Sequence, residues 1–374
     1  MQFRDLQKQY TALQPQIDEA ISKVISSGSF SQGTMITQFE QELAQFVGVE
    51  RCVSCASGTD ALRLALMVWG VGPGDAVFVP DFTFFASAEA IALQGATPIF
   101  VDVNPDTYNI DIVDLEQKIQ QAILDRKLSP KVIVAVDLFG QPADFLEIRE
   151  IADIYELYIL EDAAQGFGGK IWNEHAGSFG DISATSFFPA KPLGCYGDGG
   201  ALFTHNPEWA AIARSFAQHG KGLSKYENVR IGMNSRLDAI QAAILQVKLK
   251  AFPQEFERVN EIANRYSEAL SSLVKTPMVL PNLTSSWAQY TIQLADVAQR
   301  DALQLALRDK EIPSMIYYPT PLHKQSAFSY LELDETICPN TTKLCSTVLS
   351  LPIHPYLSDE EVQSVINTIK SSLK

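Results

Sequence analysis

The sequence predicts an α/β protein in which helices cover both faces of a mostly parallel central β-sheet, followed by a smaller C-terminal α/β domain. Short apolar segments alternate with longer amphipathic segments over the first two thirds of the chain, which is typical of parallel strands joined by helices. From about residue 279 the pattern changes to short strands and one helix. The 374 residues suffice for two domains, and we expect a large domain over residues 1–251 and a small domain over residues 252–374.

Amphipathic spacing predicts two helices near the N-terminus. Apolar residues recur at helical spacing over residues 13–25, and a turn is expected at Gly28. A second helix is predicted to begin with Thr37 as its N-cap, with Glu40 completing a capping box, and to end at Gly48.

Short apolar runs bounded by glycine and proline predict the strands of the sheet. These runs cover residues 76–79, 98–103, 132–136, 158–160 and 201–204. Each is followed by a helical pattern or a turn, so the strands are expected to be buried on both faces. In such folds ligands bind at the carboxyl ends of the strands.

Several helices are predicted from about residue 236 onward. A long amphipathic helix is expected from about residue 236 to 249. Pro253 is predicted to end it, because proline removes a backbone N–H and clashes with the preceding turn, and a separate helix is expected over residues 256–273. Further helices are expected over residues 298–307 and from Ser358 onward.

Composition excludes several classes of protein. The 29 lysines and arginines against 44 acids give a net charge of −15, which disfavours nucleic acids and anionic membranes as partners. There is no run of ~18 apolar residues, and the polar opening MQFRDLQKQY is unlike a signal peptide. Five cysteines, an odd number in a long chain, indicate reduced thiols and a cytoplasmic location.

Two residues in the middle of the chain are candidates for chemistry. The predicted strand ending at Glu161-Asp162 places Asp162 where ligands bind; the alternative is that Asp162 caps a following helix. Lys191 follows an apolar run and stands between Pro189 and Pro192. A desolvated lysine has a lowered pKa and can form a Schiff base; the alternative is a surface lysine in a loop.

A candidate phosphate site lies nearer the N-terminus. After a β-like segment, Ser57-Gly58-Thr59 opens a helical pattern, and small residues there expose backbone N–H groups to an anion. A plain N-cap is the alternative. Cys52 and Cys55 are expected to pack in the strand or in a loop, because no second cysteine pair is present and the five histidines are scattered, so a zinc site cannot be completed.

One stretch of this acidic chain is locally basic. Residues 221–236 contain Lys221, Lys225, Arg230 and Arg236 but a single acid. Such a stretch fits an anionic ligand such as a diphosphate, or equally a solvated loop that balances nearby acids. Together, a Schiff-base lysine, an acid at a strand end and a phosphate-binding helix start are the set that pyridoxal phosphate requires.

The chain resembles the DegT/StrS family of nucleotide-sugar aminotransferases, which are pyridoxal-phosphate enzymes of fold type I. The resemblance covers nearly the whole chain. Five motifs carry it in the family's order: Ser57-Gly-Thr-Asp-Ala-Leu62, Glu161-Asp-Ala-Ala-Gln165, Ser186-Phe-Phe-Pro-Ala-Lys191-Pro-Leu-Gly, Gly232-Met-Asn-Ser-Arg-Leu-Asp238 and Tyr318-Pro-Thr-Pro-Leu-His323.

The resemblance implies a role for each cofactor residue. Residues 1–251 would form the cofactor-binding domain, with Lys191 as the Schiff-base lysine and Asp162 against the pyridine nitrogen. Gln165 would bond the ring oxygen, and Phe84 would stack on the ring.

The phosphate and the substrate are assigned in the same way. The resemblance implies that Gly58, Thr59 and Ser186 hold the cofactor phosphate. Asn234 would reach the cofactor phosphate of a neighbouring subunit, which implies a homodimer with shared sites. The candidate substrate-binding residues are Tyr318, His323, Arg230 and Arg236.

The resemblance also implies a reaction. L-Glutamate would leave its amine on the cofactor, and a nucleotide-diphosphate ketosugar would then collect it, for surface glycan biosynthesis such as that of lipopolysaccharide. Within the family the chain resembles the WbpE-type enzymes, which aminate carbon 3 of UDP-2-acetamido-2-deoxy-3-oxo-D-glucuronate; shared stretches are residues 191–200 and 351–356. Tyr317 departs from the histidine expected in that type.

Three alternatives remain at this level. Amination at carbon 4, or of a neutral 6-deoxy sugar, would use the same cofactor site. A related dehydratase would carry histidine in place of Lys191. A regulatory or binding protein on this scaffold would have no need of a Schiff-base lysine.

Overall fold

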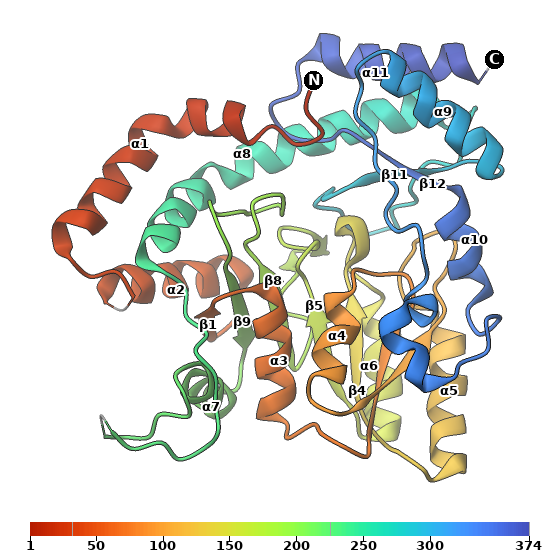
Figure 1. Ribbon diagram of the computed structural model, residues 1–374. Coiled ribbons are helices and arrows are strands. Elements are labelled where there is room, and N and C mark those ends of the chain that lie inside the picture. Colours follow the sequence, from red (N-terminus) through yellow and green to blue (C-terminus); the bar gives the residue numbers. More distant parts are fainter. Residues whose placement is uncertain (32, 225, 374) are drawn as a thin grey trace.

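The computed structural model describes residues 1–31, 33–224 and 226–373, and a seven-stranded sheet forms its centre (Figure 1). The strand order is β1-β9-β8-β5-β4-β2-β3. The bounds are β1 Arg51–Cys55, β2 Asp75–Pro80, β3 Thr97–Val101, β4 Ser129–Val136, β5 Tyr158–Asp162, β8 Ile182–Ser186 and β9 Gly200–Thr204. The pairs from β8 to β3 are parallel, whereas β9 is antiparallel to both β1 and β8. The predicted mostly parallel sheet is therefore confirmed.

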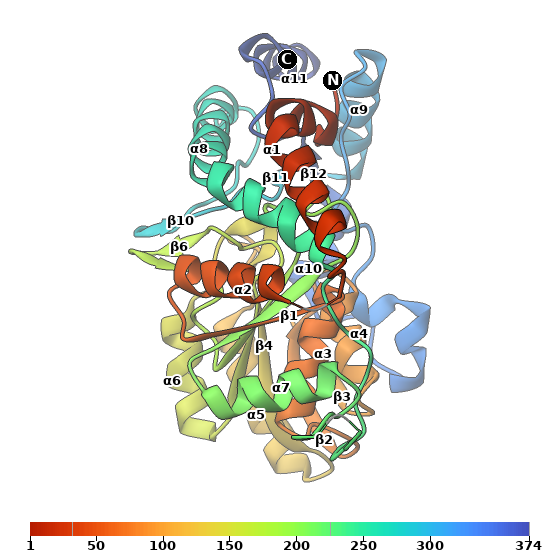
Figure 2. The same cartoon turned by 90° about the vertical axis from the view of Figure 1, so that its left-hand side faces the viewer.

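Helices cover both faces of this sheet, as Figure 2 shows edge-on with α3 and α4 on one side and α6 on the other. Along β4, Val132, Val134 and Val136 belong to the core under α3 and α4, while Ile133 and Ala135 belong to the core under α5 and α6. Burial on both faces explains the continuous apolar runs of the sequence. The helices are α2 Thr34–Val47, α3 Gly58–Val68, α4 Ala86–Ala92, α5 Ile112–Asp125, α6 Phe145–Tyr155 and α7 Pro207–Ala217.

Helix α2 begins earlier than the sequence predicted. Gly33 is its N-cap, and Thr37 lies one turn inside the helix. The predicted capping box is wrong because Glu40 is turned into the protein, where it accepts hydrogen bonds from Ser54 N–H and Oγ and pairs with Arg214. The predicted end of the helix at Gly48 is confirmed.

The longest helix, α8 Ala239–Leu270, runs unbroken through Pro253. The predicted break is wrong because tertiary packing on both sides of the proline outweighs one lost backbone hydrogen bond. Phe252 is buried in the core of the large sheet, and Val259 is buried in the C-terminal core. The expected boundary between residues 251 and 252 falls inside this helix, which α1 Leu6–Ser27 accompanies along part of its length (Figure 1).

The C-terminal part forms a smaller α/β unit. Strands β11 Tyr290–Gln293 and β12 Val348–Leu351 pair antiparallel, and their core is closed by α8, α9 Val297–Asp309 and α11 Asp359–Ser372. Helix α10 Pro339–Thr347 instead packs against the large sheet. A separate small sheet contains β6 Lys170–Ile171, β7 Glu174–His175 and β10 Leu283–Thr284. Among the described residues, no helix is long and apolar enough to cross a membrane.

Candidate functional site

A cavity of about 660 Å³ lies where the carboxyl ends of several strands meet the C-terminal unit. Its walls include the last residues of β4, β5 and β8 and the first turn of α3. Residues 316–320, which lie in the chain after α9, line the cavity from the side of the C-terminal unit. The location agrees with the rule that α/β sheets bind ligands beyond the carboxyl ends of their strands.

Asp162 ends β5 and points its carboxylate into this region. Oδ2 accepts a 2.8 Å hydrogen bond from Ser87 Oγ, and Oδ1 accepts one of 3.2 Å from the Ala164 N–H. Burial raises the pKa of Asp162, and the Ser87 bond and the charge of Lys191 act against this rise. No α-helix follows Asp162 directly, so the structure does not use it as a helix N-cap.

Lys191 lines the same cavity, in the loop that follows β8. Burial lowers its pKa; the Asp162 carboxylate acts in the opposite sense, and the guanidinium of Arg4 adds to the lowering. A lysine in this setting is more readily deprotonated than one at the surface, which is the condition for nucleophilic attack on a carbonyl carbon.

Phe84 forms one wall of the cavity. Its ring centroid lies 6.0 Å from Lys191 Nζ and 6.3 Å from the ring of Tyr318. About half of the Phe84 side chain is exposed, at 52%. An exposed aromatic ring beside a reactive amine leaves one face free for a planar ligand.

The start of α3 and the end of β8 form a cradle without room for larger side chains. Ser57 is the N-cap and accepts from the Asp60 N–H. A Cβ atom on Gly58 would lie 2.6 Å from the Cβ of Ser186, so glycine is required there. Gly58, Thr59 and Ser186 are therefore brought together at a helix N-terminus, whose first N–H groups have no partner within the helix.

Gln165 bridges the two parts of the protein. Its Oε1 accepts from the Phe139 N–H at 2.8 Å, which orients the amide so that Nε2 donates to Tyr318 Oη at 3.1 Å. Ser286 Oγ donates to the main-chain oxygen of Gln165. The amide N–H₂ thus faces the cavity, where it has a second proton to offer.

The structure does not bring His323 to the cavity wall. Its ring is buried, with Nδ1 at 2.6 Å from Asp81 Oδ2 and Nε2 at 3.3 Å from the Glu335 carbonyl oxygen. Both ring nitrogens therefore have hydrogen-bond partners within the protein, and His323 is not among the described residues that line the cavity. Tyr317 and Tyr318 do line the cavity.

Two other predicted residues lie away from this cavity. Asn234 is exposed, in an isolated β-bridge with Gln218. Arg230 donates to Ser215 Oγ at 2.6 Å and lies over the Phe216 ring. Lys225, part of the predicted basic stretch, lies outside the described residues.

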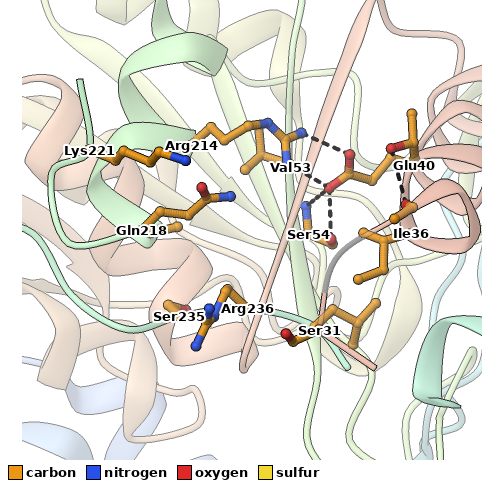
Figure 3. A pocket seen from close by; sticks show the side chains of 14 residues that line it. Ser31, Ile36, Glu40, Val53, Ser54, Arg214, Gln218, Lys221, Ser235 and Arg236 are labelled. Carbon is orange, nitrogen blue, oxygen red and sulfur yellow. Dashed lines mark hydrogen bonds and ion pairs between the residues drawn. The ribbon is translucent and has the colours of Figure 1, made fainter. Parts of the chain in front are cut away.

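Arg236 lines a second, smaller cavity of about 230 Å³, shown in Figure 3. Arg214 and Lys221 also line it, and Glu40 on the opposite side pairs with Arg214 and accepts from Ser54. Two of the four basic residues of the predicted stretch therefore meet here, in a locally cationic hollow.

Two supporting residues were not found from the sequence. Ser87 holds Asp162, and Arg4 donates to the carbonyl oxygen of Lys191 at 2.9 Å. Nothing in the local sequence distinguishes either residue, because each acts on a partner more than 70 positions away.

Pyridoxal phosphate fits the side chains that line the larger cavity. An amine with lowered pKa, a buried carboxylate and a small-residue helix start occupy its walls, and a free aromatic face lies beside the amine. These are the groups that the aldehyde, the ring nitrogen, the phosphate and the ring of this cofactor require.

Comparison with known proteins gives the same assignment. The model of the DegT/DnrJ/EryC1/StrS aminotransferase family matches residues 11–370. The chain is 41% identical to the UDP-2-acetamido-2-deoxy-3-oxo-D-glucuronate aminotransferase of Pseudomonas aeruginosa, over 98% of each chain. It is 39% identical to the UDP-N-acetyl-3-dehydro-alpha-D-glucosamine 3-aminotransferase of Acidithiobacillus ferrooxidans, over 99% of this chain and 97% of that one.

Solved structures agree with the fold. A DegT DnrJ EryC1 StrS aminotransferase from Brucella abortus superimposes with a TM-score of 0.97 at 48% identity, over 100% of this chain and 99% of that one. The PLP form of the sugar aminotransferase Spr1654 from Streptococcus pneumoniae superimposes with a TM-score of 0.88 at 26% identity, over 96% of each chain. The fold is thus fold type I, pyridoxal phosphate is the cofactor, and the chain belongs to the DegT/DnrJ/EryC1/StrS aminotransferase family.

Proposed function

We propose that this aminotransferase moves the amino group of L-glutamate to carbon 3 of a UDP-linked 3-oxo sugar, such as UDP-2-acetamido-2-deoxy-3-oxo-D-glucuronate, for surface glycan biosynthesis. One observation carries the chemistry: Lys191 and Asp162 line one cavity, together with the glycine and serine cradle at the start of α3. The two relatives above, both named for 3-oxo or 3-dehydro UDP-sugars, support the position of the reacting carbon.

Each side chain has a task that its surroundings support. When bound, pyridoxal phosphate supplies an electron sink for the bond-breaking step. Burial raises the pKa of Asp162, and the Ser87 bond and the Lys191 charge oppose that rise by favouring the carboxylate, which would hold a proton on the ring nitrogen of the bound cofactor. Lys191, whose pKa is lowered by burial, releases and accepts a proton as a general acid and base. Gln165 would donate the N–H that Tyr318 leaves free to the ring oxygen of the bound cofactor.

The sugar is proposed to lie between the aromatic wall and residues 316–320. Tyr318 and Tyr317 offer hydroxyl groups there. Lys191 is the one lysine or arginine among the described residues that line the cavity, so a sugar carboxylate would need a cation from elsewhere. We propose that Arg230 and Arg236 of a second subunit supply this positive charge. A neutral 3-oxo sugar, or a carbon-4 ketone, is the alternative substrate in the same cavity.

We propose a homodimer with shared sites. Asn234 is exposed, and the chain after α7 runs out from the body of the molecule before it returns to α8 (Figure 1). Leu223 and Ile231 in this segment are almost fully exposed, at 105% and 92%, which is unusual for large apolar side chains unless another surface covers them. We also propose a cytoplasmic location, since all five cysteines are free and buried.

Visible absorption tests the first half-reaction. Protein purified with pyridoxal phosphate should be yellow and should lose the colour with L-glutamate. Lys191→Ala should not complete this cycle, whereas Lys23→Ala, at an exposed lysine, should behave like wild type. A protein that stays colourless with added cofactor would overturn the proposal.

The second half-reaction identifies the sugar. The bleached protein is offered the 3-oxo uronate, the neutral 3-oxo N-acetylglucosamine nucleotide, or a 4-oxo-6-deoxy nucleotide sugar. Return of the colour with the first supports the named substrate. Return with the second or third alone would move the assignment to the corresponding alternative.

A further inference from the structure

The loop that carries Lys191 is poor in backbone donors and is held from outside. Pro189 and Pro192 lack N–H groups on either side of the lysine. The guanidinium of Arg4 donates to the carbonyl oxygen of Lys191 at 2.9 Å and to that of Pro192 at 3.4 Å. Further along the loop, Lys248 Nζ donates to the Gly194 carbonyl oxygen at 2.7 Å. The reactive lysine therefore depends on contacts from distant parts of the chain for its backbone position.

Arg4 reaches this loop from a short segment that precedes α1. Figures 1 and 2 place the N-terminus at the end of the molecule formed by the C-terminal unit. Phe3 packs edge-on against Tyr317, a cavity wall residue, with ring centroids 6.1 Å apart. Residues 3 and 4 thus touch both the sugar side and the lysine side of the cavity.

The charge of Arg4 also acts on Lys191. Burial lowers the pKa of Arg4 to about 10, so it remains a cation at neutral pH. Two charges act on the Lys191 amine: Asp162 favours its protonated form, and Arg4 opposes it; Asp198 also lines the cavity. Without Arg4, the Asp162 carboxylate would act on the lysine with no opposing cation among these groups.

We propose that Arg4 is a positioning residue for Lys191: its guanidinium holds the Lys191 and Pro192 carbonyl oxygens in place and sets a fixed positive charge against the loop that carries the amine. The contact lies within one chain. It gives the N-terminal segment a direct part in the chemistry of a lysine 187 positions away.

The test compares Arg4→Met, which removes both the hydrogen bonds of the Arg4 Nη2 group and the positive charge, with Arg4→Lys, which keeps the charge. Lys8→Met is the matched control: it removes a cation from the same N-terminal region, where Lys8 pairs with Glu361 at 3.1 Å. In cofactor-free protein, the rate at which cyanate modifies Lys191 is followed against pH by mass spectrometry. Melting temperatures establish that each variant is folded.

We expect the labelling midpoint of Lys191 to move to higher pH in Arg4→Met and to stay nearer the wild-type value in Arg4→Lys and Lys8→Met. In holoenzyme, kcat should fall by about 10- to 100-fold in Arg4→Met, with KM changed by less than about threefold, because a displaced reactive group loses rate before binding. Should Arg4→Met fail to fold, Arg4→Lys still reports, through kcat, the loss of the guanidinium hydrogen bonds to the two carbonyl oxygens.

An unchanged midpoint in folded Arg4→Met would overturn the inference. So would an equal shift in Lys8→Met, which would trace the effect to general docking of the N-terminal helix. The turnover measurement rests on the proposed function, but the labelling does not. A shifted midpoint in a protein that transfers no amino group would keep this inference and reject the proposed function.

Discussion

Replacing Ser87 by alanine tests how far the Ser87 hydrogen bond favours the charged form of the Asp162 carboxylate. Ser87 Oγ donates to Asp162 Oδ2 at 2.8 Å, and both side chains are buried, at 2% and 6% exposure. The substitution removes one of the two hydrogen bonds that the described residues donate to this carboxylate. It leaves the shape of α4 intact, because alanine is a better helix former than serine.

The lost hydrogen bond sets the size of the expected loss in cofactor affinity. A hydrogen bond to a buried charged group contributes about 1.5 to 3 kcal/mol, and about 1.4 kcal/mol corresponds to a tenfold change in affinity. Cofactor affinity should therefore fall about 10- to 100-fold in Ser87→Ala. The bond lowers the pKa of Asp162 against the effect of burial, so its loss raises that pKa. Protonated Asp162 then persists to higher pH, and the defect should be largest under mildly acidic conditions.

Titration of cofactor-free protein with pyridoxal phosphate over a pH series measures this directly. Ser87→Ala is compared with wild type and with Ser329→Ala, at an exposed serine. We expect the affinity curve of Ser87→Ala to lie below wild type and to be displaced to higher pH. Equal affinities at every pH would refute the assignment of Ser87 as the support of Asp162, and a uniform loss without displacement would attribute the defect to packing.

Three further predictions concern the scaffold. Gly58→Ala should reduce cofactor affinity at least ~100-fold with a small loss of stability, because its Cβ would lie 2.6 Å from Ser186 Cβ; calorimetric titration with pyridoxal phosphate checks this. Burial lowers the pKa of His354 to about 4, so the free energy of unfolding should fall as pH drops from about 6.5 towards 4, since the unfolded chain binds the proton first; in His354→Gln the pH dependence by urea denaturation should be shallower. Burial and the Glu161 charge raise the pKa of Asp137, which favours its neutral form, so Asp137→Asn should cost under ~1 kcal/mol. Glu161→Gln should cost about 2 to 4 kcal/mol, because Glu161 accepts from three backbone N–H groups and one hydroxyl. Equal losses in the two variants would contradict this view of the pair.

The elements of the sheet were predictable because their signals are local. Runs of apolar residues marked β2, β4, β5 and β9 within a few residues of their observed bounds, and Gly48 marked the end of α2. Predictions failed where packing overrode a local rule. Pro253 does not end its helix, and Glu40 leaves its expected cap to accept hydrogen bonds from Ser54 and Arg214.

The residues of the site also divide into those that the sequence predicted and those whose position only the structure gave. Lys191, Asp162 and Gly58 belong to contiguous motifs with a recognisable order, and the structure places all three on one cavity. His323 belongs to such a motif too, yet its ring is hydrogen-bonded to Asp81 and is not among the described residues that line the cavity. Whether a motif residue lines a pocket or supports it depends on which way its backbone turns, which the motif does not specify.

By itself, the sequence determined the alternation of strands and helices, the chemical types present and their order along the chain. The tertiary structure alone decided which distant groups act on one another. Ser87 reaches Asp162 across 75 positions, and Arg4 reaches the Lys191 carbonyl across 187. The physical reason is that hydrogen bonding and charge depend on distances of a few ångströms in space, and neither serine nor arginine carries a local pattern that announces its partner.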